Sequence, residues 1–116
     1  ETEFVFWYPP YSILYWICDA QKELDAVIRE LEYMTEQLLA YNNVRVFCFQ
    51  NNREIVCNLN NYADYTHYHA YMPYIVESFN NGDNELTWEN YEEVLSDLRE
   101  LASSYDYEAI YDNWYD

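Results

Sequence analysis

The chain has 116 residues, with 22 Asp and Glu against 5 Lys and Arg, which gives a formal net charge of −17 at pH 7. This charge excludes direct binding to nucleic acid, because affinity for a polyanion comes from lysine and arginine, and it equally disfavours anionic membranes. Because 51% of the residues are hydrophobic and 21% are aromatic, burial compensates the entropy of ordering so charged a chain. We therefore expect a single compact domain, residues 1–116, with basic partners.

The first predicted element is a short extended segment at residues 3–8, which ends at two prolines that disfavour helix before them. A long helix is expected from about residue 12 to residue 41, where apolar residues recur every three or four positions. The uncharged run Phe4–Cys18 is shorter than the roughly 20 residues of a spanning helix. It also lacks a basic leader, so we expect neither a membrane anchor nor a secretion signal.

The next segments predict a small antiparallel sheet. Residues 44–50 and 53–59 alternate between two faces and are separated by two asparagines, which is typical of a β-hairpin. One face of this hairpin is wholly apolar and would pack on the long helix. A weaker alternation at residues 62–69 leaves two alternatives, a hairpin alone or a three-stranded sheet.

The last third of the chain predicts acidic helices. A short helix is expected at residues 73–79, and a longer one from Thr87 as N-cap to Tyr105, with Trp88 first in its core-facing stripe. Residues 107–116 place aromatic side chains on one helical face and acids on another. The predicted fold class is therefore α+β, with a long N-terminal helix packed on a small antiparallel β-hairpin or three-stranded sheet, followed by two or three acidic helices.

Metal binding and catalysis find little support in the sequence. Cys48, Cys57, His67 and His69 are residue types that bind zinc, but their spacing matches no zinc knuckle, and we interpret the cysteines as small hydrophobic residues. A two-histidine metal site is the weaker alternative. The loop around Gly82 resembles a calcium loop in composition only, because the alignment puts apolar residues at ligand positions. No phosphate loop or nucleophile elbow is present, so we predict no cofactor, no metal and no enzymatic activity.

The acids cluster toward the end of the chain. From Asp83 to Asp116 there are eleven acids and one base, Arg99. Helices usually mix the two signs because opposite charges one turn apart stabilise them, so this excess repels itself without helping the fold. We interpret it as a field that attracts a basic partner, with tyrosine and tryptophan as short-range anchors. The predicted partner-binding residues are Glu85, Glu89, Glu92, Glu93, Asp97, Glu100, Asp106, Glu108, Asp112, Tyr115 and Asp116.

In size, acidity and aromatic richness the whole chain resembles the DNA-mimic inhibitors of phages and mobile elements, which disable CRISPR effectors or restriction enzymes. The resemblance implies an inhibitor that blocks the basic DNA- or RNA-binding cleft of a nuclease in a bacterial cell. Three cysteines without a disulfide-like spacing agree with the reducing cytoplasm. Two alternatives stay open: an immunity protein or antitoxin that neutralises a basic toxin, and an acidic chaperone for histone-like proteins.

Overall fold

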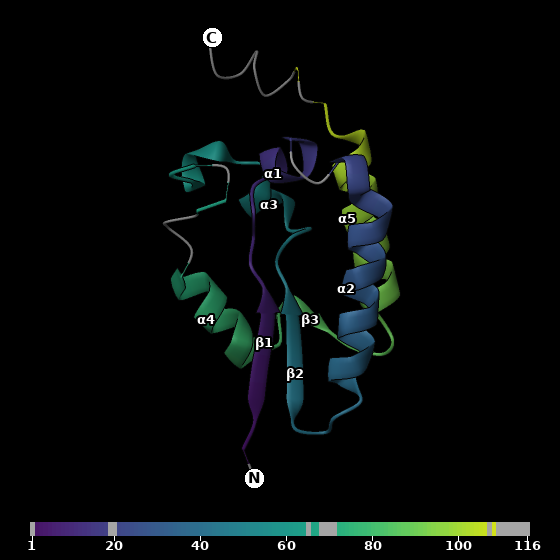
Figure 1. The fold of residues 1–116 in the computed structure, drawn as a ribbon. Coiled ribbons are helices and arrows are strands. Elements are labelled where there is room, and N and C mark those ends of the chain that lie inside the picture. Colours follow the sequence, from purple (N-terminus) through teal and green to yellow (C-terminus); the bar gives the residue numbers. More distant parts are fainter. Residues whose placement is uncertain (1, 19–20, 65, 68–71, 107, 109–116) are drawn as a thin grey trace.

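The computed structural model describes residues 2–18, 21–64, 66–67, 72–106 and 108. Within these residues the chain combines helices with a three-stranded mixed sheet, which confirms the α+β class (Figure 1). The elements in chain order are β1 (Phe4–Tyr8), α1 (Ile13–Cys18), the 3-10 turn η1 (Gln21–Glu23), α2 (Leu24–Leu39), β2 (Val44–Cys48), α3 (Arg53–Val56), the 3-10 turn η2 (Leu59–Asn61), α4 (Met72–Asn81), β3 (Glu85–Leu86) and α5 (Tyr91–Ser104).

The sheet has the strand order β1-β2-β3. β1 runs parallel to β2, with Phe4 opposite Val44 and Tyr8 opposite Cys48, and β2 pairs antiparallel with β3. Parallel neighbours require a crossover connection, and α1 and α2 provide it. The predicted extended segment at residues 3–8 is therefore confirmed, as an edge strand of the sheet.

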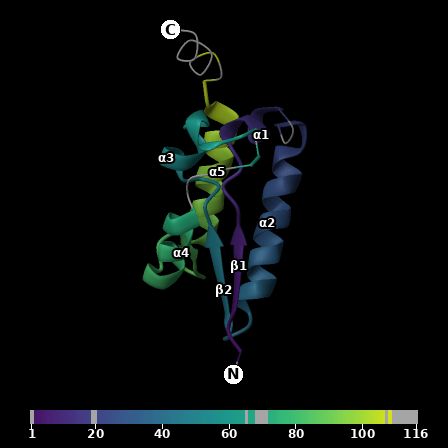
Figure 2. The ribbon, with the colours of Figure 1, turned by 90° about the vertical axis from the view of Figure 1, so that its left-hand side faces the viewer.

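Helices cover both faces of the sheet. Figures 1 and 2 show α2 on one side of β1 and β2, and α4 on the other. Val46 and Cys48 point into a core cluster with residues of α2 and α5, whereas Phe47 and Phe49 pack with Ile75 of α4. Because both faces are covered, residues 46–49, which are the last three residues of β2 and the residue after it, are all buried.

The predicted hairpin of residues 44–50 and 53–59 is wrong in its second half. Residues 53–59 contain α3 and the start of η2, and β2 pairs with β1 and β3. Both edges of β2 are thus occupied by strands from distant parts of the sequence. The chain turns helical after Asn52, whose C=O accepts the N–H of Val56 at 2.9 Å. Ile55 and Val56 are both buried, as in a helix and unlike an alternating strand.

The third strand predicted at residues 62–69 is also wrong for the part that the structure describes. Asp64 Oδ1 accepts the N–H groups of Thr66 and His67, each at 2.9 Å, and this local turn competes with strand pairing. Residues 65, 68 and 69 lie outside the described residues. The sheet does have three strands, one of the two predicted alternatives, but other segments supply two of them.

The single helix predicted from residue 12 to residue 41 is in fact two helices, α1 and α2, separated at η1. α1 contributes to two parts of the core. Ile13 packs with Val56 and Leu101, whereas Trp16 joins Leu24 and Ile28 of α2 in the cluster that lies against the sheet. The apolar residues keep a helical spacing on both sides of η1, so the periodic pattern hides the break between the two helices.

The helix predicted at residues 73–79 is confirmed as α4 and extends by one residue at its start and two at its end. It ends just before Gly82, whose N–H donates to the Ser78 carbonyl at 2.8 Å. Gly82 has a φ of 80°, in the left-handed region that favours glycine at the end of a helix.

The long C-terminal helix is confirmed, but it begins at Tyr91 and Thr87 is not its N-cap. Thr87 opens a turn instead: its carbonyl accepts the N–H groups of Asn90 and Tyr91, and its own N–H donates to Asn90 Oδ1. Trp88 therefore lies in a turn and is 54% exposed, outside the predicted core stripe. Of the closing segment 107–116, only Glu108 is among the described residues.

Candidate functional site

The acids of the C-terminal half are positioned by the packing of α5 against α2. Two contacts tie these helices near opposite ends. The Tyr91 hydroxyl donates to Glu36 Oε1 at 2.8 Å, and Arg99 Nη1 lies 2.8 Å from Asp25 Oδ1. Asp25 and Glu36 are eleven residues apart, so they share one flank of α2. The helices are therefore antiparallel and held in one register.

Tyr91 joins two carboxylates through one hydroxyl group. Its side chain is buried, and its oxygen lies 3.1 Å from Glu92 Oε1 as well as 2.8 Å from Glu36 Oε1. The hydrogen bond to Glu36, together with burial and the neighbouring Glu92, raises the pKa of Tyr91 well above its ordinary value. The hydroxyl consequently stays protonated, and its single proton is shared between acceptors on two different helices.

Four predicted partner-binding acids are exposed on α5 or in the turn before it, and we call this set the α5 acidic face. It consists of Glu89, Glu92, Glu93 and Glu100, all exposed. Glu93 and Glu100 are seven residues apart and so lie on the same side of α5, roughly 10 Å from each other along its axis. Glu89 stands in the turn before the helix. The α5 acidic face is therefore a set of exposed carboxylates on a fixed helix and in the turn before it.

A shallow hollow of about 420 Å³ lies beside this face. At its rim, Asp97 accepts two hydrogen bonds from Arg53, at 2.8 and 2.9 Å, and one from Asn51 at 3.0 Å. The hydrogen bonds from Arg53 lower the pKa of Asp97 below its ordinary range. Asp97 was predicted to bind a partner, but its charge is already paired within the chain, where it ties α3 to α5.

Glu85, another predicted partner-binding acid, is also paired with an arginine of the chain. Its two carboxylate oxygens accept hydrogen bonds from Arg45, at 2.8 and 3.1 Å. Arg45 also donates to the Phe79 carbonyl, so this pair links β2, β3 and α4. Arg45, 40 residues before Glu85, was placed in the predicted hairpin, so its partner could not be found from the sequence. Of the remaining predicted acids, Asp106 and Glu108 are exposed beyond α5, and Asp112, Tyr115 and Asp116 lie outside the described residues.

The chain holds too few cations to neutralise its acids. Arg45, Arg53 and Arg99 each pair with a carboxylate, and those three are most of the five basic residues in the sequence. All three of these arginines tie separate elements together. The cations therefore stabilise the fold, and the α5 acidic face keeps its charge.

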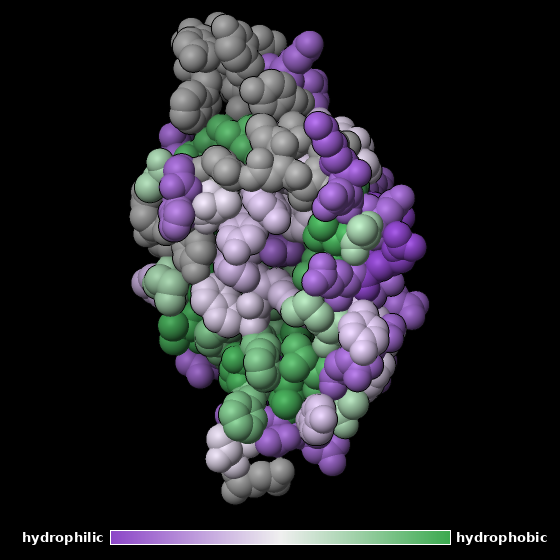
Figure 3. All heavy atoms as spheres, in the orientation of Figure 1, coloured by the Kyte–Doolittle hydropathy of each residue, from purple (hydrophilic) through white to green (hydrophobic). Residues whose placement is uncertain are grey.

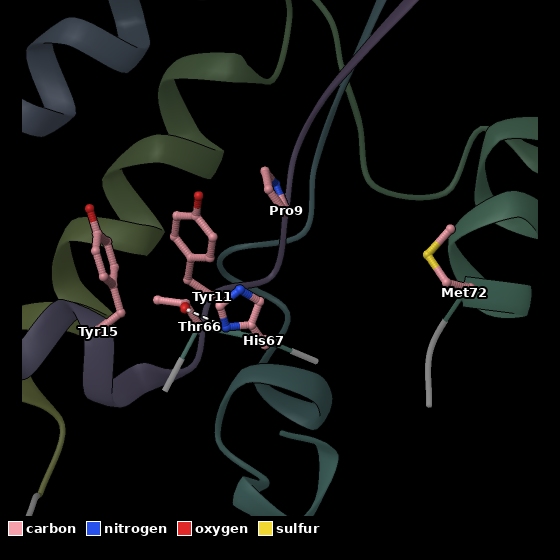
Figure 4. Close-up of a pocket in the computed structure, with 6 residues that line it drawn as sticks. All are labelled: Pro9, Tyr11, Tyr15, Thr66, His67 and Met72. Carbon is pink, nitrogen blue, oxygen red and sulfur yellow. Dashed lines mark hydrogen bonds between the residues drawn. The ribbon is translucent and has the colours of Figure 1, made fainter. Parts of the chain in front are cut away.

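A second hollow, of about 620 Å³, is lined by Pro9, Tyr11, Tyr15, Thr66, His67 and Met72 (Figure 4). His67 Nδ1 lies 2.7 Å from Asp64 Oδ2, and hydrogen bonds from the N–H groups of Thr66 and His67 lower the pKa of Asp64. In Figure 4 the two tyrosines and His67 gather on one side and Met72 stands across from them. Cys48 and Cys57 do not line this hollow and belong to the core clusters around β2 and α3.

The positions of the cysteines and of His67 do not support the metal sites considered in the sequence analysis. No group of three His, Cys, Asp or Glu side chains able to hold a metal occurs among the described residues, and His69 lies outside them. Burial raises the pKa of Cys48 to about 11 and also raises the pKa of Cys57. Both thiols therefore stay protonated, in agreement with their interpretation as small hydrophobic residues.

The α5 acidic face is thus the best-defined candidate for a functional surface. Within the described residues, no helix combines the length and the apolar character needed to cross a lipid bilayer. Comparisons of the chain with protein-family models, with curated proteins and with solved structures find no match.

Proposed function

We propose that this protein is a nucleic-acid-mimicking inhibitor, which occupies the basic DNA- or RNA-binding cleft of a nuclease such as a CRISPR effector or a restriction enzyme. It acts in the cytoplasm, binds no nucleic acid itself and catalyses no reaction. One observation carries the proposal: a chain of net charge −17 uses three of its four arginines to join elements and leaves an exposed row of carboxylates on a well-packed helix.

The physical basis is competition for the same cations. Duplex DNA presents about one negative charge per 1.7 Å of its axis, and a cleft that binds it must display lysine and arginine. Carboxylates on a rigid helix bind such cations without the entropy cost of ordering a flexible segment. Tyr91 and Arg99 fix α5 against α2 and so supply this rigidity. Trp88, exposed next to Glu89, adds an aromatic anchor at the end of the row.

The first experiment identifies the partner. The tagged chain is used to capture proteins from a bacterial lysate, and the captured protein is tested for nuclease activity in the presence of the chain. We expect inhibition that weakens steeply with salt. We also expect duplex DNA to displace the chain. A ternary complex of nuclease, DNA and inhibitor would contradict mimicry and favour the immunity-protein alternative, and capture of many unrelated basic proteins would favour the chaperone alternative.

The second experiment locates the surface. The double variant Glu93→Lys/Glu100→Lys is expected to lower the association rate with the captured nuclease by about tenfold or more, because these charges steer the encounter. The matched control is Glu77→Lys/Asp83→Lys, which makes the same change in net charge at exposed positions in and after α4. Equal losses in both variants would assign the attraction to total charge and not to the α5 acidic face.

A further inference from the structure

β1 forms an outer edge of the sheet, and its first residues are unusually exposed for apolar side chains. Phe4, Val5 and Phe6 are 50%, 39% and 42% exposed. Figure 3 shows hydrophobic residues gathered over the lower part of β1 and β2. Among the described residues no strand lies outside β1. Edge strands usually carry lysine, proline or a bulge that blocks further pairing, and Phe4–Phe6 carries none of these.

The register of the sheet identifies which backbone groups face outward. The Phe4 N–H donates to the Asn43 carbonyl at 2.8 Å, and the Tyr8 carbonyl accepts the N–H of Phe49 at 3.2 Å. Residues 4 and 8 therefore direct their backbone groups toward β2. Because these directions alternate along a strand, the N–H and C=O of Val5 point to the open edge. An added strand would bond to them.

The apolar surface continues from β1 onto α2. The Tyr8 hydroxyl lies 2.9 Å from Thr35 Oγ1, which places α2 over this side of the sheet. Met34 of α2 is exposed. At about 100° per residue, its flank of the helix is opposite Glu36, which reaches α5. The exposed side chain of Met34 therefore lies on the flank of α2 that faces away from α5, on the side of β1.

The charges around the open edge of β1 indicate which sign of charge a bound segment should carry. Glu3 precedes Phe4, and Glu30 lies one turn before Met34 on the same flank of α2; both are exposed. Arg45, which interacts electrostatically with Glu3, is already bound to Glu85. A second copy of a chain of charge −17 would be repelled, whereas a segment with lysine or arginine would be attracted.

We propose that an extended segment of the basic partner, with apolar residues alternating with Lys or Arg, adds to the sheet as a fourth strand beside β1. This inference rests on the proposed function for the positive charge of the partner. It assigns the contact to a surface separate from the α5 acidic face. The partner is then held at two places, by charge at α5 and by backbone pairing at β1.

The test uses a capped synthetic peptide of about eight alternating Val and Lys residues, longer than a typical strand. We expect it to bind and to slow hydrogen exchange of the Val5 amide. The variant Val5→Pro removes the outward N–H without removing a bond to β2, and should weaken binding by about tenfold or more. The matched control Val5→Thr keeps the N–H and should bind as the natural chain does. Equal binding by Val5→Pro would overturn the proposal.

Further arms keep the result decisive. If Val5→Pro fails to fold, the same peptide with N-methyl groups at alternate residues tests the backbone pairing instead, and unchanged affinity would overturn it. A Val-Glu peptide that binds equally well would overturn the basic occupant. A dimer in sedimentation that Val5→Pro abolishes would assign the edge to a second copy. Glu93→Lys/Glu100→Lys should weaken Val-Lys binding much less than Val5→Pro does, so a failure of nuclease inhibition remains distinguishable from a failure of edge pairing.

Discussion

The side of the molecule formed by α2 and α5 differs sharply from the edge formed by β1. Hydrophilic residues gather where α2 lies, whereas hydrophobic residues gather over β1 and β2 (Figure 3). The first region presents carboxylates, and the second presents exposed phenylalanine side chains and open backbone groups. Charge acts over several ångströms and weakens with salt, whereas strand pairing acts only at contact. The net charge of the chain therefore describes only one of its two candidate surfaces.

The two regions also differ in how much of each side chain the fold needs. Leu98 of α5 is fully buried, whereas half of Phe4 in β1 already lies in solvent. We expect Leu98→Ala to lower the free energy of unfolding by about 2–5 kcal/mol. Phe4→Ala should lower it by less than half as much. Urea denaturation of both variants checks this contrast, and equal losses would mean that β1 is a part of the core.

Removing the hydroxyl that joins α2 to α5 tests whether the helix pair is rigid. Tyr91→Phe is expected to cost about 1–2 kcal/mol, because Glu36 loses a hydrogen bond to a charged acceptor and faces Glu92 without it. The same substitution, Tyr91→Phe, is also made in the variant Glu36→Gln, where it should lower the free energy of unfolding by clearly less. A full double-mutant cycle by urea denaturation measures the difference. Additive losses would show that this contact contributes no coupling.

The ion pair at the rim of the α5 acidic face predicts a specific pH dependence. Arg53 lowers the pKa of Asp97, so the pair stabilises the fold above the ordinary aspartate value of about 3.9 and is lost as pH falls below it. Both side chains are partly exposed, so Arg53→Ala should cost about 1 kcal/mol or less at neutral pH. The difference in stability between Arg53→Ala and the natural chain should shrink below about pH 4.

Thermal melts between pH 7 and pH 2 measure this difference. Arg29→Ala is the control, because it removes the same charge and the contact of Arg29 is with the Asp25 backbone carbonyl. The melting curve of Arg29→Ala should follow the natural chain more closely across the acid range. A gap between Arg53→Ala and the natural chain that persists at pH 2 would contradict the role assigned to Asp97.

The smallest expected effects distinguish the two ends of the α5 acidic face. Glu93 stands in the first turn of α5, where the helix dipole favours a negative charge, and Glu100 stands near the other end. Glu93→Gln should destabilise the fold by a few tenths of a kcal/mol, and Glu100→Gln should not. Low-salt urea denaturation resolves this contrast. Identical shifts would mean that total repulsion outweighs the local field of the helix.

The elements that were predicted correctly are those with a local signal. The apolar run of residues 4–8 before two prolines predicted β1, and the core-facing apolar stripe between Thr87 and Tyr105 predicted α5. The failures concern partners distant in sequence. The neighbours of β2 are β1 and β3, some 40 residues away on either side, and no local pattern identifies them. The hairpin prediction failed for this reason.

In the candidate site, too, the features with a local signal were predicted and the contacts between distant residues were missed. Helical spacing predicted that Glu100 and either Glu92 or Glu93 lie on the outer side of the last long helix, and Glu92, Glu93 and Glu100 are all exposed. The pairing of Asp97 with Arg53 depends on α3, and the sequence pattern predicted a strand at these residues. The ion pair that Asp97 forms within the chain was therefore missed. The open edge of β1 was missed because an apolar run is usually buried.

The parallel pairing of β1 with β2 also has a consequence for synthesis. Residues 4–8 leave the ribosome before their partner strand, and about 40 further residues must be translated before Phe4 meets Val44. At about 5–20 residues per second, this interval lasts on the order of 2–8 s. During that time a nascent segment of five apolar and aromatic residues has no sheet to join, so the youngest chains are the form of this protein most in need of a chaperone.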